Sequence, residues 1–458
     1  MTLTRNLATL IVDTQIRSIP NAAIQAAREV VLDGIAVMIA GAGEPLGIGR
    51  ISIEYASRLG GTPVATVIAG GFKTNILNAA YANGTMCHAL DYDNTGWPLN
   101  HPTSPTLPTI LALAENYKLS GSEILGAVVL AFEVQGRLRM ATARVAAGTG
   151  FHKPGVSGTI GATTAAGKLL KLNVDKMCVA FGIAGSRCGS LSVNTGTMTK
   201  SSHSGHAARM GAEAGLLAEM GFTATDDVFG KGQFFELFYG AGNFDSELLV
   251  QKFGKPYWIA DPGVGFKKHP SNYFTHRPID AALAIAAKSE IKPENVEKVE
   301  IDFPRFDYVN RPAPTTGLDG KFSVQYATIV ALLDRQVRIS SFSDARRFAP
   351  DIEAMLKKVK LNVRDDIPKS FDTSWATVRV HLKDGNVLEE RCDKPRGIWG
   401  VPLSRGERID KFNICVEGAL TPKDADRVVA LVEDMQDLQS IDELMAIVGR
   451  ATPVQYQV

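Results

Sequence analysis

A polar, turn-rich segment at residues 88–101 carries the residue types that proton transfer requires. The imidazoles of His88 and His101 flank the carboxylates of Asp91 and Asp93 and the hydroxyl of Thr95. A carboxylate and an imidazole at one site can supply both an acid and a base, as proton transfer next to a carboxylate demands. A turn whose Asp and Thr side chains cap the neighbouring helices would have the same composition. Composition alone favours the two interpretations equally.

A second polar segment, residues 199–209, combines a cation with imidazoles. Lys200 and His203 come just before residues 206–220, a stretch of small residues that we expect to be helical. A lysine beside a helix N-terminus forms a site for an anion. The segment therefore predicts an anion site.

Two further segments could add to such a site. Lys267 and Lys268 fall where two predicted domains meet, and clefts between domains often bind ligands. A solvated basic linker would have the same composition. His152 is a lone imidazole before a Gly-rich stretch, for which a structural role is the default interpretation. The combination of four such segments favours a functional site.

We predict neither a metal nor a cofactor. The segment from Asp91 opens like a calcium loop, but Pro102 stands at the twelfth position, where a bidentate Glu is required. His203 and His206 are spaced like metal ligands, yet no third ligand follows at a familiar spacing. The five cysteines contain no Cys-x-x-Cys pair, which disfavours zinc, an iron–sulfur cluster and a disulfide framework. Neither a P-loop nor a dinucleotide-binding Gly motif occurs.

Helices are expected to position these residues as far as about residue 260. Apolar residues recur at helical spacing over residues 21–40, 104–115 and 123–143. Ser120 followed by Glu123 fits a capping box at the start of the third helix. Residues 159–170 and 206–220 are rich in small residues, which suits helices that approach each other closely.

The pattern changes after Pro262. Alternating apolar residues predict strands over residues 299–303, 358–363, 376–382 and 387–391, the last two joined by a hairpin turn at Asp384-Gly385. Helical spacing returns over residues 424–435 and 441–448. We therefore predict a mainly α protein, with a helical domain of residues 1–263 and 401–458. Residues 264–400 would form an inserted, smaller α+β lid domain.

Composition and charge are those of an ordinary globular protein. Of 458 residues, 45% are hydrophobic and 21% are charged, and the formal net charge is +1. No basic excess would attract nucleic acid or an anionic membrane. No apolar run reaches the roughly 18 residues of a membrane span, and the N-terminus does not resemble a secretory signal. We expect a cytoplasmic protein without nucleic-acid or membrane partners.

At these segments the chain resembles the MmgE/PrpD family over essentially its whole length. The motifs that carry the resemblance are His88-Ala89-Leu90-Asp91-Tyr92-Asp93-Asn94-Thr95 with His101-Pro102, Phe151-His152, Thr197-Met198-Thr199-Lys200 with Gly205-His206-Ala207-Ala208-Arg209, Phe266-Lys267, and Thr275-His276 with Ile279-Asp280. The resemblance implies an all-helical domain built from both chain ends, a smaller α+β lid domain and a homodimer. Family members dehydrate 2-methylcitrate, decarboxylate cis-aconitate or epimerise iminodisuccinate, without a metal or organic cofactor.

The resemblance also implies roles for individual residues. The implied catalytic residues are His101, Asp91, Thr95 and Tyr308, and the implied substrate-binding residues are His152, Lys200 and Lys267, with Lys268 as a weaker candidate. Two positions depart from the family pattern. Asn272 stands where the decarboxylase branch carries a His, and Asn94 replaces an acidic residue. Because Asn cannot act as an acid or a base, proton delivery at those positions would differ.

We therefore expect a cofactor-independent lyase for a small di- or tricarboxylate, with His101 as the acid/base and the cations holding carboxylates. The substrate would bind in a cleft between the two domains. Decarboxylation, dehydration and epimerisation share a carbanion-like or enolate-like intermediate, so the sequence leaves a lyase and an epimerase or isomerase open. A polycarboxylate-binding protein without catalytic activity is the third alternative.

Overall fold

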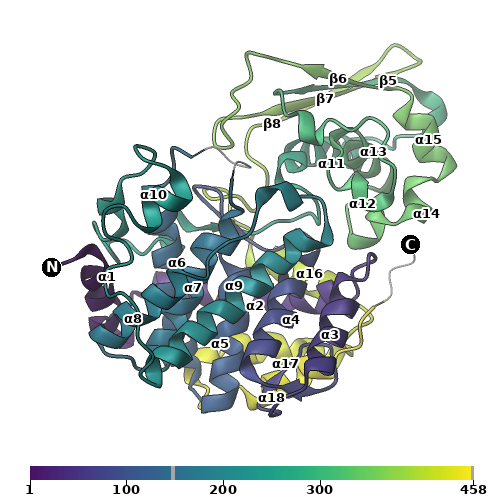
Figure 1. Ribbon diagram of the computed structural model, residues 1–458. Coiled ribbons are helices and arrows are strands. Elements are labelled where there is room, and N and C mark those ends of the chain that lie inside the picture. Colours follow the sequence, from purple (N-terminus) through teal and green to yellow (C-terminus); the bar gives the residue numbers. More distant parts are fainter. Residues whose placement is uncertain (146–149, 455–458) are drawn as a thin grey trace. The chain divides into compact units, whose positions relative to one another are not determined.

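The computed structural model describes residues 1–145 and 150–454 (Figure 1). This part of the chain divides into two compact units, one of Met1–Phe266 with Ser404–Val454 and one of Lys267–Leu403. The expected boundaries after residues 263 and 400 each lie three residues before the observed ones, after 266 and 403. The two units are described separately below.

The first unit is built mainly of helices, and short strands account for little of it. Its helices from the N-terminal part of the chain are α1 (Leu3–Asp13), α2 (Asn21–Ala42), α3 (Ile48–Leu59), α4 (Ile76–Ala89), α5 (Thr103–Tyr117), α6 (Gly121–Ala141), α7 (Lys153–Leu169), α8 (Val174–Gly185), α9 (Met198–Glu219) and α10 (Phe234–Tyr239). The C-terminal segment adds α16 (Arg405–Val416), α17 (Pro422–Glu433) and α18 (Asp442–Gly449). The mainly α fold expected from the sequence is confirmed.

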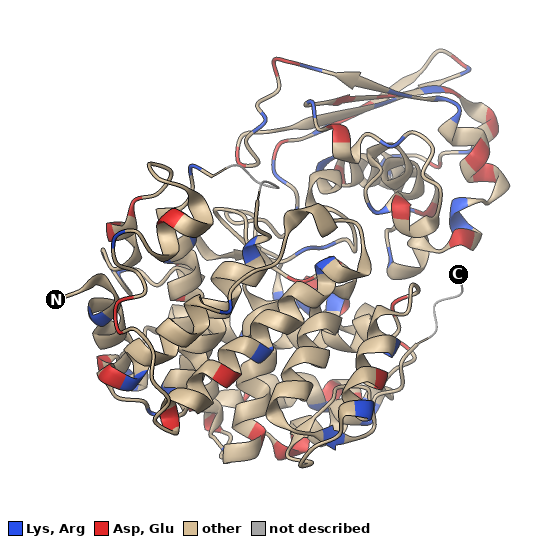
Figure 2. Ribbon diagram, viewed as in Figure 1, with Lys and Arg blue, Asp and Glu red and all other residues tan. Residues whose placement is uncertain are grey.

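Local sequence accounts for the start of several helices. The side chain of Ser120 accepts a hydrogen bond from the Glu123 amide at 3.3 Å, and the Glu123 carboxylate accepts one from the Ser120 amide at 3.0 Å. This is the predicted capping box of α6. Asn75 caps α4 in a similar way, accepting from the amide of Asn78 at 2.9 Å. Figure 2 shows few charged residues along the central helices: α4 has no Lys, Arg, Asp or Glu, and α5 has only Glu115, as expected for helices buried on most of their faces.

The start of α9 differs from the prediction. The sequence placed Lys200 and His203 before a helix beginning near His206, but α9 begins at Met198, so both residues lie inside its first turns. Ser, His and Lys are only a few tenths of a kcal/mol to about 0.7 kcal/mol worse than Ala in a helix. These residues can therefore form a helix, although their spacing lacks the apolar pattern by which a helix is usually predicted.

Glycines allow α4 and α9 to approach each other closely. A Cβ atom on Gly205 would lie 2.2 Å from Oγ1 of Thr85 and 2.3 Å from the carbonyl oxygen of Tyr81. A Cβ atom on Gly84 would lie 2.9 Å from the Cα atom of Gly205. Only glycine fits at this crossing, so the two backbones pack almost directly against each other. The crossing brings the N-terminal turns of α9 towards the C-terminal end of α4.

The second unit is a sheet covered by helices. The strands β5 (Val296–Phe303), β6 (Val359–Val363), β7 (Ala376–Leu382) and β8 (Val387–Cys392) form a sheet in the order β6-β5-β7-β8. The pair β5–β6 is parallel, and the other two pairs are antiparallel. The predicted hairpin joins β7 to β8, and Gly385 takes the left-handed conformation its turn requires, with φ of +89°.

Helices of this unit bury one face of the sheet. The helices that pack on the sheet are α11 (His276–Lys288) and α13 (Val324–Asp334), and the other helices of this unit are α12 (Gly317–Gly320), α14 (Asp344–Arg347) and α15 (Pro350–Leu356) (Figure 1). Apolar residues of α11 and α13, such as Ile285 and Val330, share one core with strand residues such as Val299 and Val378. The α+β character expected for this region is present.

No helix in the described part of the chain combines the length and the apolar character that crossing a membrane requires. All five cysteines lie in this part of the chain, and each is free.

Candidate active site

The C-terminal end of α4 and the loop after it position most of the polar cluster. His88 lies in the last turn of α4, and Asp91 follows in a left-handed conformation with φ of +50°. Asp is one of the few residues that adopt this conformation readily. The chain then runs through Asp93 into the short strand β3 (Thr95–Gly96), which pairs with β4 (Val264–Gly265). The tight turn at Asp91 thus keeps both carboxylates near the helix end.

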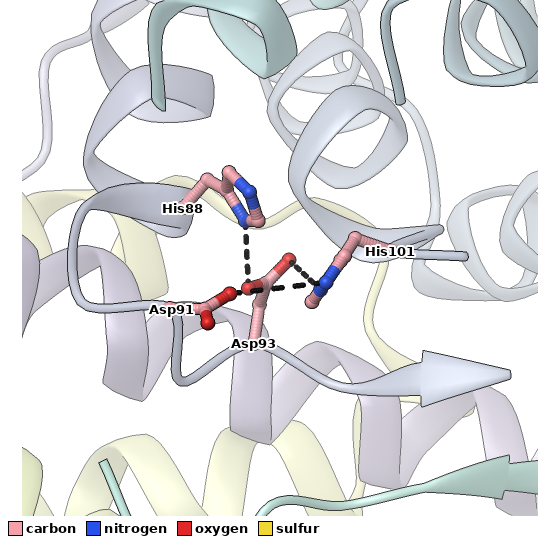
Figure 3. A group of neighbouring side chains, drawn as sticks. All are labelled: His88, Asp91, Asp93 and His101. Atoms are coloured by element: carbon pink, nitrogen blue, oxygen red, sulfur yellow. Dashed lines mark hydrogen bonds and ion pairs between the residues drawn. The ribbon is translucent and has the colours of Figure 1, made fainter. Parts of the chain in front are cut away.

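Four side chains converge at this turn (Figure 3). Nδ1 of His88 lies 2.9 Å from Oδ1 of Asp93, and Nδ1 of His101 lies 3.3 Å from Oδ2 of the same carboxylate. Nε2 of His101 is 3.8 Å from Oδ1 of Asp91. The rings of His88 and His101 meet edge to face, with centroids 4.6 Å apart. One carboxylate therefore lies between two imidazoles, and a second faces the outer nitrogen of His101.

Lys200 adds a positive charge to this cluster. Its Nζ atom lies 3.0 Å from Oδ1 of Asp91, although it belongs to a different helix, α9. One residue further on, the hydroxyl of Ser201 donates to the carbonyl of His88 at 3.3 Å. The close crossing of α4 and α9 makes both contacts possible, so the two polar segments found in the sequence form one group.

His152 and His203 form a second imidazole pair beside the first. Their Nδ1 atoms are 3.1 Å apart, and the backbone amide of His152 donates to the carbonyl of Ser190 at 2.8 Å. Ring centroids are 5.1 Å apart between His152 and His203 and 5.8 Å apart between His152 and His88. Four imidazoles thus follow one another from His101 to His203. In a bond between two Nδ1 atoms of neutral rings, only one of the two atoms carries the proton.

Burial keeps three of these imidazoles neutral. It lowers the pKa of His88 to about 4, even though the carboxylate of Asp93 favours the charged ring. Burial and the nearby charge of Lys200 hold the pKa of His152 well below its usual value and lower that of His203 to about 4. Burial alone would raise the pKa of Asp93, but the two imidazoles against its oxygens hold it well below its usual range. At neutral pH the cluster contains an ionised Asp93 beside neutral His88.

Residues from both ends of the chain support the Asp91–Asp93 turn from behind. Lys411 of α16 is 4% exposed and donates to the carbonyl oxygen of Tyr92 at 3.0 Å. Its ammonium also lies 4.1 Å from the centroid of the Tyr92 ring and 2.5 Å from Oδ1 of Asp33 on α2. This buried ion pair fixes the backbone between the two carboxylates.

Two neighbouring polar residues have unused hydrogen-bonding capacity. Thr95 and Asn94 are buried, and neither the Thr95 hydroxyl nor the Asn94 side-chain amide has a hydrogen-bond partner within the residues that the structure describes. Buried polar groups are nearly always satisfied in a working state. A ligand or ordered water at this corner would supply the missing partners.

The donor set also bears on metal binding. One ligand atom from each of His88, Asp91, Asp93 and His101 lies within 4.8 Å of all the others. Imidazoles and carboxylates together suit zinc and similar ions. However, the ammonium of Lys200 already lies against Asp91, and it would repel a second cation placed among these atoms. The arrangement fits a hydrogen-bonded acid/base group better than a metal centre.

The structure brings together Asp91, His101 and Lys200, and it places Thr95 and His152 in the same unit. Tyr308, Lys267 and Lys268 belong to the second unit. Within that unit, the hydroxyl of Tyr308 donates to Oδ1 of Asn272 at 3.0 Å. Lys267 is 1% exposed, and its ammonium lies 5.8 Å from the ring centroid of Tyr273. Asn272, one of the two departures from the family pattern, is therefore a hydrogen-bond partner of Tyr308.

Sequence reasoning assigned no role to several residues that complete the site. Asp93 and His88 stand in the polar motif, and His203 stands beside Lys200 in the segment predicted to bind an anion, with metal binding as its alternative. Their spacing in the sequence does not predict that they contact Asp91, Lys200 or one another. Lys411 and Asp33 could not have been found from the sequence, because each lies in an ordinary helix far along the chain from Tyr92.

Comparisons with known proteins agree with the motifs. Models of the MmgE/PrpD N-terminal and C-terminal domains match residues 5–247 and 269–437. A cis-aconitate decarboxylase from Mus musculus is 32% identical in an alignment of 457 positions that covers 96% of this chain and 92% of the relative. The cis-aconitate decarboxylase of Homo sapiens is 29% identical, covering 98% of this chain and 95% of the relative. That of Aspergillus terreus is 27% identical, covering 93% and 92%. These findings confirm the resemblance seen in the sequence.

Proposed function

Because this chain belongs to the MmgE/PrpD family and is a lyase of that family, we propose that it decarboxylates cis-aconitate by acid/base chemistry without a cofactor. The observation that carries the proposal is the contact of the Asp91 carboxylate with both His101 and Lys200, at 3.8 and 3.0 Å. It combines a proton carrier with a cation that can hold a carboxylate. The names of the full-length relatives support the choice of substrate.

The reaction needs one proton for each carbon dioxide released. The bond between the departing carboxylate and its carbon breaks, and its electron pair is left on the substrate. A double bond and a second carboxylate next to this carbon spread the charge as in an enolate. The carbon then takes up a proton. An enzyme for this step must hold carboxylates firmly and present an acid to carbon.

The residues of the first unit suit these tasks. Lys200 would bind a substrate carboxylate by a charge-assisted hydrogen bond, and neutral His152 would donate a second one. His101 would deliver the proton through Nε2, with Asp91 and Thr95 placing it and the substrate. In the second unit, Lys267, Lys268 and Tyr308 would complete substrate binding, as the resemblance implies. The homodimer and the cytoplasmic location expected from the sequence are parts of the same proposal.

The first experiment follows the products of the purified, chelator-treated protein by mass spectrometry. Separate incubations with cis-aconitate and 2-methylcitrate distinguish loss of carbon dioxide from loss of water. Carbon dioxide from cis-aconitate is the expected result. Loss of water from 2-methylcitrate alone would replace the proposal with a dehydratase. If both acids are unchanged in mass, incubation in heavy water tests for hydrogen exchange, which would indicate an epimerase.

His101→Ala tests the acid/base assignment. General acid/base catalysis contributes about 100-fold or more, so kcat should fall by at least that factor. His381→Ala is the matched control, because His381 is a histidine on β7 that is 2.9 Å from Glu300 and has no proposed catalytic role. Near-normal turnover by His101→Ala would remove His101 from the mechanism.

Full activity in the chelator-treated protein is expected, and restoration of activity only by added zinc or another divalent ion would overturn the cofactor-free proposal.

A further inference from the structure

The proposed mechanism gives no role to the carboxylate of Asp93. It is fully buried, and each of its oxygens faces a different imidazole (Figure 3). Oδ1 lies 2.9 Å from Nδ1 of His88, and Oδ2 lies 3.3 Å from Nδ1 of His101. Oδ2 of Asp93 and Nδ1 of His101 have no hydrogen-bond partner among the described residues, so this second contact lacks the alignment of a hydrogen bond in the structure. Contacts of this kind often tighten when a substrate binds.

The protonation of the group follows from its surroundings. The pKa of Asp93 is held well below its usual range, so the carboxylate is ionised and can only accept hydrogen bonds. His88 is neutral at pH 7, because burial lowers its pKa to about 4, so its single proton lies on Nδ1, facing Asp93. Any hydrogen between Asp93 and His101 must likewise come from Nδ1 of His101. Lys200, Asp91 and His152 are the other charged or titratable groups near this ring.

We propose that Asp93 is a positioning residue that holds the His101 proton on Nδ1 and thereby leaves Nε2 as the nitrogen that exchanges a proton with the substrate. The hydrogen bond from His88 fixes the carboxylate so that its second oxygen stays directed at His101. Asp91 and Lys200 then lie on the Nε2 side of the ring, where a carboxylate substrate would be held. This inference rests on the proposed role of His101. A carboxylate that sets the tautomer of a catalytic imidazole is a known device in hydrolases with a Ser-His-Asp triad.

The informative substitution is Asp93→Asn. The carbonyl oxygen of the new amide would accept from His88, so its NH2 group would face Nδ1 of His101 and force the proton onto Nε2. The expected result is a fall in kcat of about 100- to 10,000-fold with a much smaller change in KM. Asp302→Asn is the control, since Asp302 is a buried acid of the second unit that pairs with Arg379 at 2.9 Å.

A second measurement uses the unmodified protein. Nitrogen-15 NMR of protein labelled at histidine distinguishes protonated from unprotonated ring nitrogens, and the His101 signals are identified by their loss in His101→Gln. The proposal requires Nδ1 of His101 to carry the proton in the neutral ring. A proton on Nε2, or an Asp93→Asn variant with wild-type kcat, would overturn it. The NMR result does not depend on turnover, so a protein that releases no carbon dioxide would refute the proposed function without refuting the tautomer.

Discussion

The ammonium of Lys200 lies 3.0 Å from Oδ1 of Asp91, although 109 residues separate them along the chain. Their side chains are only 13% and 11% exposed, so solvent and salt screen the pair less than they screen a surface ion pair. The contact depends on the crossing of α4 and α9 at Gly84 and Gly205. The close packing of α4 and α9 at these two glycines therefore brings the Lys200 ammonium next to the Asp91 carboxylate.

Lys200→Met should reduce kcat/KM by about 10- to 100-fold, because a hydrogen bond to a charged group contributes about 1.5–3 kcal/mol. Steady-state kinetics with cis-aconitate would measure the loss. Lys171→Met is the control, since Lys171 is 76% exposed and pairs with Glu123 at 3.3 Å. Equal kcat/KM in Lys200→Met and the wild type would exclude Lys200 from substrate binding.

His203→Ala should weaken substrate binding by removing the partner of His152. If His203 donates from Nδ1, His152 keeps its proton on Nε2 and can donate it to a carboxylate. We expect KM to rise about tenfold, the loss of roughly one net hydrogen bond. His203→Asn should restore most of the affinity, because its amide NH2 can donate in place of Nδ1. Failure of Asn to do better than Ala would contradict this role for His203.

The free energy of unfolding should decrease as the pH falls from 7 to 5. The pKa of His88 is lowered to about 4 from an ordinary 6.5. Below pH 6.5 the unfolded chain therefore binds a proton that the folded protein does not bind, and this difference favours unfolding. Fully developed, it amounts to roughly 3 kcal/mol for this one residue. Urea unfolding at pH 7, 6 and 5 would measure the trend, and a free energy that did not change with pH would contradict the neutral, buried state of His88.

Gly205→Ala should destabilise the helical unit and reduce activity together. The added Cβ atom would meet the Tyr81 carbonyl oxygen at 2.3 Å, so α4 and α9 must separate. Overpacking of this kind costs about 1–3 kcal/mol, and the separation would move Lys200 away from Asp91. Gly189→Ala is the matched control, because a Cβ atom added there would meet no atom of the described residues within 4 Å. Thermal unfolding and kcat/KM should both change in Gly205→Ala and stay near wild type in Gly189→Ala.

The fold was predictable where the signal was local. The helix predicted over residues 21–40 is α2, Asn21–Ala42, and the predicted start of α6 is set by the capping box at Ser120. Apolar spacing and caps act over one or two turns, so they can be read without the tertiary structure. The predicted start of α9 was too late, because the first turns of this helix are polar and their Lys200 contacts Asp91 instead of an apolar core.

The candidate site was predictable only within single segments. Asp91 and His101 stand in one motif, so their proximity could be inferred. The contacts of Lys200 with Asp91 and of Lys411 with Tyr92 join segments far apart in the chain, and they depend on how the helices pack. Proton positions on His101 and His203 depend on individual distances, which no periodicity reveals.

The contact between Lys411 and Tyr92 also bears on the order in which the protein is made. Tyr92 lies in the turn that carries Asp91 and Asp93, and its supporting lysine is synthesised 319 residues later. A ribosome must therefore release nearly the whole helical unit and the inserted second unit before this turn acquires its buried ion pair. Nascent chains that end before α16 hold every acid and base of the cluster, yet they lack the residue that fixes the backbone between its two carboxylates. Lys411 can therefore hold the Asp91–Asp93 turn only after α16 has been synthesised.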